Sequence, residues 1–143
     1  MIRALFTVIV FFFISQTCLN KPINYKTDER VLFLIENGSY TRHNIRSFMC
    51  LAVEVNVTNN VEGSEWICEL IDKIMIKRPY VFIREYNNLS EKEKEILDDC
   101  IGSMSEDAKP QLAYQKIKHT RTVYSQSKER ILNMIILNIQ ANP

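Results

Sequence analysis

Four cysteines and two histidines are the residues of this 143-residue chain whose chemistry depends most on spacing. The cysteines are Cys18, Cys50, Cys68 and Cys100. No two of them form a Cys-x-x-Cys pair, and His43 and His119 each stand apart from other metal-binding residue types. We therefore expect no metal site and no other cofactor. Widely spaced cysteines favour disulfides, which are typical of small secreted proteins.

Catalytic chemistry is not indicated by the remaining polar residues. A hydrolytic triad needs a nucleophile, a base and an orienting acid, yet both histidines lie among polar neighbours in predicted helices. The chain has no Gly-x-Ser-x-Gly or His-Glu-x-x-His motif, and three glycines are too few for a phosphate-binding loop. Asp98 and Asp99 share a predicted helix with Glu91 and Glu95 and are interpreted as solvated charges. We expect that the protein is not an enzyme.

The stretch Ser64–Met75 is the helix around which the other elements are expected to pack. Its apolar residues recur at i, i+3, i+4, i+7 and i+8, which places them on one helical face. These residues are Ile67, Leu70, Ile71, Ile74 and Met75. The only tryptophan, Trp66, and Cys68 lie near this face. The regular stripe predicts a central packing helix.

Glycines and prolines divide the rest of the chain into similar segments, which predicts an all-α bundle of about five helices. Ser90 and Glu93 form a capping box, which fixes the start of the fourth segment. A short helical piece is predicted after Pro79, over Tyr80–Tyr86. The polar middle of the final segment indicates either one long helix that is partly exposed there or a break near Thr120–Thr122. The five expected segments are Thr27–Asn37, Thr41–Val57, Ser64 to the Arg78-Pro79 pair, Ser90–Met104 and Ser105–Gln140.

The first 20 residues predict a signal peptide. Arg3 precedes the apolar run Ala4–Ile14, and small residues follow at 15–18. Cleavage is expected between residues 17 and 21, leaving 21–143 as a single helical domain. The apolar stretch Ile131–Ile139 is interrupted by asparagines and is too short to span a membrane. We expect a secreted, extracellular protein that is not stably inserted in a membrane after cleavage.

The cysteine pairing remains open between two arrangements. If the second and third segments are antiparallel neighbours, Cys50 and Cys68 lie within roughly 3 Å of the same level along the helix axes. Their bridge would close a loop of ~17 residues and stabilise the fold by about 3 kcal/mol. This pair is preferred, and it leaves Cys100 as a thiol or as the partner of Cys18. The alternative joins Cys68 to Cys100 and leaves Cys50 for Cys18.

Three Asn-x-Ser/Thr sequons fall at predicted turns and suggest N-glycosylation of Asn37, Asn56 and Asn88. Overall charge is nearly balanced, with 18 basic and 17 acidic residues. A chain without excess positive charge has no electrostatic reason to bind nucleic acid. Nucleic acid is therefore not expected among its partners.

Two functions fit a small secreted helical protein. The preferred hypothesis is an effector-like or cytokine-like protein that binds another extracellular protein. Tyrosine and arginine are common at the centres of such interfaces. The expected partner surface comprises Tyr80, Arg84, Tyr86, Lys118 and Arg121.

The alternative is a carrier of a small apolar ligand, held in a cavity between helices. The residues that could line this cavity are Phe48, Met49, Trp66, Ile71, Met75, Phe82 and Tyr124. Size, helices and disulfides are similar to those of insect odorant-binding proteins. That family's cysteines spaced three residues apart are absent here, so membership does not follow. A cavity would favour the carrier, whereas a filled core would favour the binding protein.

Overall fold

Apolar residues at helical spacing fold the chain into helices throughout its described part. The computed structural model describes Cys18 and residues 25–57, 61–104 and 107–142, with the side chains of 25–28 and 61–66 outside the described set. These residues form seven helices and no strand, which confirms the all-helical prediction. The helices are α1 (Tyr25–Glu36), α2 (Arg42–Val57), α3 (Val61–Lys77), α4 (Pro79–Asn87), α5 (Glu91–Gly102), α6 (Pro110–His119) and α7 (Ser125–Ala141).

The predicted number of about five helices is wrong, because the short piece expected after Pro79 is a separate helix and the final segment contains two helices. Pro79 cannot continue α3, so it opens the separate helix α4 at its first position. In the final segment α6 begins at Pro110, and the helix is interrupted between His119 and Ser125. The expected start at Ser105 lies outside the described residues. The Lys128 ammonium bonds the carbonyl oxygens of Lys118 and Thr120 at 2.7 and 2.9 Å, which satisfies the end of α6.

Helix α3 is the centre of the fold, as its apolar stripe predicts. All five stripe residues are buried, and α3 packs against α1, α2, α4, α5 and α6. The helix begins at Val61, so the expected start at Ser64 is wrong and Gly63 lies inside the helix. The side chain of Trp66 lies outside the described residues.

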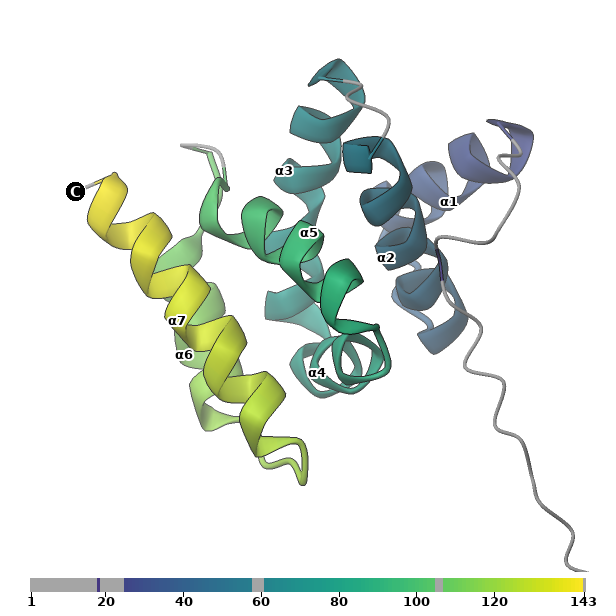
Figure 1. Ribbon diagram of the computed structural model, residues 1–143. Helices are drawn as coiled ribbons and strands as arrows, with labels where there is room; N and C mark the ends of the chain where they lie inside the picture. Colours follow the sequence, from purple (N-terminus) through teal and green to yellow (C-terminus); the bar gives the residue numbers. More distant parts are fainter. Residues whose placement is uncertain (1–17, 19–24, 58–60, 105–106, 143) are drawn as a thin grey trace, which may run out of the picture.

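The other helices surround α3 in two pairs. Figure 1 shows α1 and α2 on one side of α3 and α6 and α7 on the other, with α5 between the pairs. The short helix α4 closes one end of the molecule, where it contacts α2, α3, α6 and α7. The capping box at the start of α5 is confirmed, because Ser90 and Glu93 bond each other's backbone N–H. No described helix is both long enough and apolar enough to cross a membrane.

A disulfide joins Cys18 to Cys50 on α2. The preferred pairing of Cys50 with Cys68 is therefore wrong, and the Cys18–Cys50 bond of the alternative arrangement is present. The other two cysteines are buried thiols on α3 and α5. Cys68 shares a hydrogen bond with Cys100 on α5. Which cysteines meet depends on how each helix is rotated about its axis. A shared level along the helix axes, on which the Cys50–Cys68 prediction relied, is not sufficient.

Candidate functional site

Helix α4 carries the exposed aromatic and basic residues that the sequence singles out. Its apolar residues Val81, Phe82 and Ile83 pack into the core, which turns Tyr80 and Arg84 outward. These two residues are one helical turn apart. The guanidinium carbon of Arg84 lies 5.8 Å from the centre of the Tyr80 ring. This cation–π contact holds a planar cation beside an exposed ring.

Glu85 forms hydrogen bonds with arginines of two helices, α2 and α4. Its side chain is only 3% exposed, and one carboxylate oxygen, Oε1, accepts bonds from two guanidinium groups. Arg42 Nε lies 2.7 Å from this oxygen and Arg84 Nε lies 3.2 Å from it. Arg46 donates to the Glu85 backbone carbonyl oxygen at 3.3 Å. One buried negative charge thus orients several positive charges, and the Arg42 side chain remains 63% exposed.

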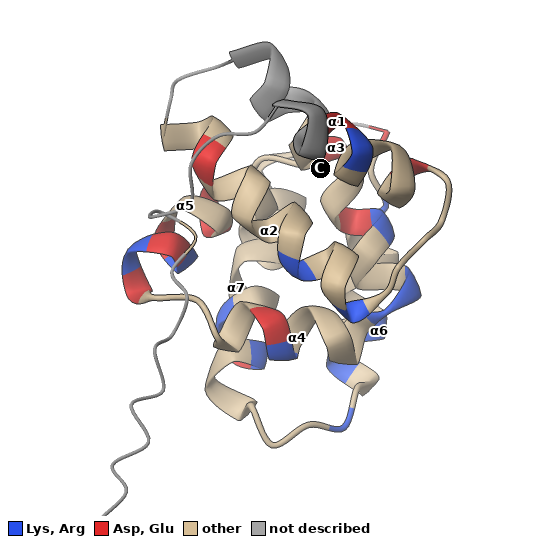
Figure 2. Cartoon of the chain, turned by 90° about the vertical axis from the view of Figure 1, so that its right-hand side faces the viewer, with Lys and Arg blue, Asp and Glu red and all other residues tan. Residues whose placement is uncertain are grey.

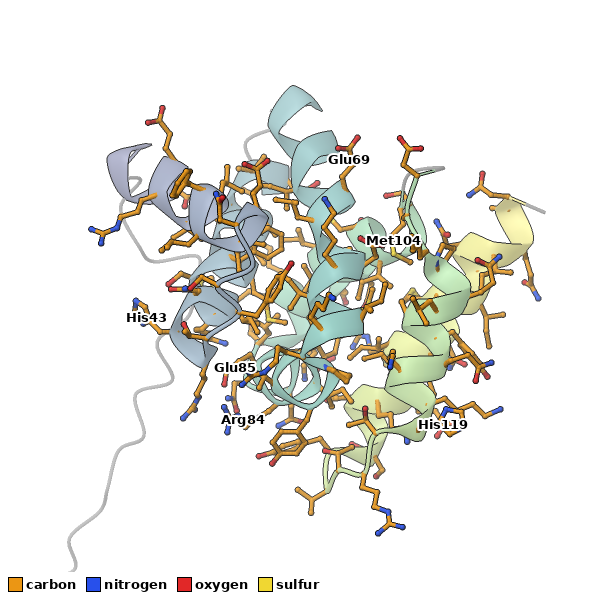
Figure 3. The ribbon with its side chains drawn as sticks, turned by 180° about the vertical axis from the view of Figure 1, so that it is seen from behind. His43, Glu69, Arg84, Glu85, Met104 and His119 are labelled. Carbon is orange, nitrogen blue, oxygen red and sulfur yellow. A yellow bond between two sulfur atoms is a disulfide. The ribbon has the colours of Figure 1, made fainter. Side chains whose placement is uncertain are left out.

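Further basic side chains lie at and just after the end of α6. Lys118, His119 and Arg121 are exposed, and the Lys118 ammonium lies 5.6 Å from the centre of the Tyr114 ring. Helix α6 contacts α4. Figure 3 shows Arg84 and His119 at the same end of the molecule and Glu69 at the opposite end.

We call the surface formed by these residues the basic end. It comprises Arg42, Arg46, Tyr80, Arg84, Lys118 and Arg121. In Figure 2 the region of α4, α6 and the loop between α6 and α7 carries Lys and Arg, with few acidic positions. Four of its members were predicted from the sequence. Arg42 and Arg46 were missed, although their spacing of one helical turn is a local signal that they share a face.

Tyr86 does not belong to this surface, so its prediction as a partner residue is wrong. Its side chain is fully buried, and its hydroxyl donates to Asp98 Oδ1 at 2.6 Å. Burial and the bond to Asp98 raise the pKa of Tyr86 well above its usual range. Six positions separate Tyr80 from Tyr86, and that spacing places the two rings on different faces of α4.

The residues proposed to line an apolar cavity form the core of the bundle. Five of them are fully buried: Phe48, Met49, Ile71, Met75 and Phe82. Tyr124 is half-buried against this core. The side chain of Trp66 lies outside the described residues. Of these residues, the six with described side chains line neither of two surface pockets, one between α3 and the start of α6 and one on α7.

The larger pocket has a volume of about 480 Å³ and lies between α3 and the start of α6. Its lining includes the charged residues Glu69, Lys73, Asp107 and Lys109 beside Tyr40. Burial, and secondarily the negative charge of Asp72, raises the pKa of Tyr40. A lining of this polarity differs from the apolar cavity that a carrier of apolar ligands needs.

The three sequon asparagines differ in their surroundings. Asn37 follows α1 and is exposed, and Asn88 is exposed in the turn after α4. Asn56 lies inside α2 and is half-buried. Its amide Nδ2 donates to the carbonyl oxygen of Ala52 at 2.7 Å and to Cys100 Sγ at 3.3 Å. At Asn56, the amide that would carry a glycan is therefore directed into the protein.

Among the described residues, no group of three or more His, Cys, Asp or Glu side chains is arranged to hold a metal ion. Comparison with protein-family models, with curated proteins and with solved structures found no match. Any role of the basic end is therefore argued from its own residues.

Proposed function

We propose that this chain is a secreted protein, without enzymatic activity, that acts by binding an extracellular protein through the basic end. The observation that carries the proposal is the pair of guanidiniums on Glu85. Arg42 and Arg84 bring two positive charges to a single buried carboxylate, so a net positive charge remains at an exposed surface. A partner that presents carboxylates at this position would neutralise the remaining positive charge.

Preorganisation makes this surface suited to binding. Glu85 and the Tyr80 ring already restrict Arg84, so less side-chain entropy is lost when a partner binds. Arginine forms paired hydrogen bonds with carboxylates, and tyrosine contributes a large rigid contact area. The filled core supports a binding surface in preference to an internal cavity for an apolar ligand.

The proposal can be tested with a fluorescein-labelled octaglutamate peptide as a model of an acidic protein segment. Fluorescence anisotropy should show binding that weakens as salt is added, because exposed charges are screened. The double variant Arg42→Ala/Arg84→Ala should lose about tenfold or more in affinity. Tyr80→Ala should weaken binding more than Tyr80→Phe, which keeps the ring.

Two controls separate this surface from nonspecific attraction. The double variant Lys73→Ala/Lys92→Ala removes two exposed cations from α3 and α5 and should retain the affinity of the unmodified protein. A labelled DNA duplex of similar charge should bind more weakly than the peptide. Equal losses in both double variants, or preferential binding of DNA, would contradict a protein-binding role for the basic end.

A further inference from the structure

The backbone nitrogen of Cys18 lies in a buried position that the predicted cleavage would change chemically. The Cys18 side chain is bonded to Cys50, and the residue is almost fully buried. Its backbone N–H donates to Oε1 of Glu93. Cys18 is thus attached both to α2, through sulfur, and to the first turn of α5, through nitrogen.

Glu93 has a second role besides the capping of α5. Its other carboxylate oxygen, Oε2, accepts from the backbone N–H of Ser90 at 2.8 Å and from the Ser90 hydroxyl at 2.9 Å. These bonds complete the capping box and direct Oε1 toward Cys18. Glu93 is 0% exposed, so the group that faces Oε1 interacts with the carboxylate with little screening by water.

We infer that the chain is cleaved between Thr17 and Cys18, and that the α-amino group released there forms a buried ion pair with Glu93. Hydrolysis consumes one water, leaving a carboxylate on Thr17 and an ammonium on Cys18. The nitrogen that now donates as a peptide N–H would then donate as a cation. The bond from a neutral peptide N–H to the carboxylate would thus become an ion pair, and two opposite charges attract strongly where water screens them little.

Cleavage at other positions would not produce this arrangement. A cut after Cys18 or Asn20 would remove Cys18 and with it the bond to Cys50. A cut before Thr17 would leave a neutral peptide nitrogen against Glu93. Ser15 and Thr17 supply small residues three positions and one position before the proposed cut, as signal cleavage requires. The mature chain would begin with a residue held by a disulfide and an ion pair.

The inference rests on the proposed secretion but not on the proposed partner. Full-length protein should be expressed in cultured eukaryotic cells and recovered from the medium. Intact mass and N-terminal sequencing are expected to show Cys18 as the first residue. A first residue at Leu19 or later, or any residue before Cys18, would overturn the inference. Failure of octaglutamate binding would leave this result unaffected.

The ion pair can be tested separately by moving the charge. A mature chain extended by one glycine before Cys18 keeps both cysteines and the backbone N–H, but its ammonium is displaced from Glu93. This extension should lower Tm by about 5 °C. In the unextended chain Glu93→Gln should lower Tm by a similar amount. In the extended chain, where the ammonium is already displaced, Glu93→Gln should lower Tm little further. Fully additive losses would refute the pairing.

A chemical measurement on the unextended, unsubstituted chain tests the ion pair without any variant. The α-amine of a buried ion pair should react with an acylating reagent at neutral pH at least tenfold more slowly in native protein than in guanidinium chloride. The glycine-extended chain should react rapidly in both conditions. Glu95→Gln, an exposed change on α5, is the matched control and should alter neither Tm nor reactivity. Rapid acylation of the native Cys18 amine would contradict the ion pair.

Discussion

At the scale of single residues, the direction of a side chain separates the three sequons. Asn37 and Asn88 are exposed, whereas the Asn56 amide donates two hydrogen bonds inside the protein. A glycan replaces one of the two Nδ2 hydrogens, so a glycan on Asn56 would remove one of these bonds and require space inside the protein. Sequence alone treats the three sites equally because all three match the same short motif.

We therefore expect secreted protein to carry glycans on Asn37 and Asn88 and none on Asn56. Enzymatic removal of N-glycans converts each occupied asparagine to aspartate, which peptide mass spectrometry detects. Asn56 should remain asparagine in this measurement. The variant Asn56→Gln should leave the glycan mass unchanged, whereas conversion of Asn56 would show that α2 is not closed when glycans are added.

The buried thiols of Cys68 and Cys100 are expected to join when the protein is oxidised. Each loses one hydrogen, and glutathione disulfide is reduced to two glutathione molecules. Their hydrogen bond, and secondarily burial, raises the pKa of the Cys100 thiol well above its usual range. Because the thiolate is the reactive form, native-state oxidation should be slow and should keep accelerating as pH rises past 9.

Peptide mapping without reduction would identify the resulting link. Cys68 should be found with Cys100, and Cys18 should remain with Cys50. In Cys68→Ser, Cys100 should stay a thiol and the Cys18–Cys50 link should be unchanged. A Cys50–Cys68 peptide in the unmodified protein would contradict the observed arrangement of α2, α3 and α5.

At the scale of elements, side chains from one helix complete the ends of another. Asp72 on α3 is buried, and its Oδ2 accepts from the backbone N–H of Lys109 at 3.0 Å. Lys109 precedes the first residue of α6 and provides no side-chain cap itself. The other Asp72 oxygen, Oδ1, has no hydrogen-bond partner within the described part of the chain. Helix α3 therefore supplies a cap that the local sequence of α6 lacks.

Replacing Asp72 should distinguish this bond from the cost of burying a charge. Asp72→Ala leaves the Lys109 N–H unpaired and should lower the free energy of unfolding by about 1–2 kcal/mol. Asp72→Asn keeps an acceptor and removes the charge, so its stability should stay within about 0.5 kcal/mol of the original. Urea denaturation measures both, with the exposed change Glu69→Ala as control. Greater stability of Asp72→Ala would show that charge burial dominates.

A polar network joins α4, α5 and α7. The Tyr86 hydroxyl donates to Asp98 Oδ1 at 2.6 Å, and Arg130 Nε donates to Asp98 Oδ2 at 2.6 Å. Arg130 also bonds Glu91 on the surface at 2.6 Å. Both oxygens of Asp98 thus have donors, which a mostly buried carboxylate requires.

Tyr86→Phe should lower the free energy of unfolding by about 1–2 kcal/mol, since Asp98 loses a buried donor. The raised pKa also predicts alkaline sensitivity. The Tyr86 contribution is fully present below the unfolded pKa of about 10 and is lost as pH rises above it. Urea denaturation between pH 8 and 11 should show a smaller decline for Tyr86→Phe than for the original protein. The exposed change Tyr80→Phe should not alter the decline, and equal slopes in all three would exclude Tyr86 as its source.

At the scale of the whole molecule, one disulfide connects the start of the described chain to the helical bundle. The Cys18–Cys50 bond closes a loop across 32 residues. Restricting the unfolded chain over that length should stabilise the protein by about 4 kcal/mol. The variant Cys18→Ser/Cys50→Ser should therefore unfold at a lower urea concentration than the original protein. Without urea, the variant should keep its secondary structure. A loss below about 1 kcal/mol would show that the bond contributes little to the folded state.

The distribution of charge over the surface is also a property of the whole molecule. The composition is close to neutral, and the sequence offers no electrostatic preference for a partner. Folding brings Arg42 and Arg46 of α2 beside Arg84 of α4, across about 40 residues of chain, while Glu69 lies at the far end of the molecule. The basic end is thus a product of helix packing, and composition could not reveal it.

The sequence by itself determined the all-helical fold and the positions of several helices, because the causes of both are local. Repeating apolar positions placed Ile67, Ile71 and Met75 in the core, and Ser90 with Glu93 set the start of α5. Pro79 alone was sufficient to separate α4 from α3. Each of these signals acts within a few residues, so a reader of the chain can recognise it.

The tertiary structure alone decided which side chains meet. Cys50 faces Cys18 and not Cys68, and Tyr86 faces Asp98 and not solvent. These outcomes depend on how each helix is rotated about its axis and on which neighbour covers it. The packing of all the helices sets both at once, and no single segment contains that information.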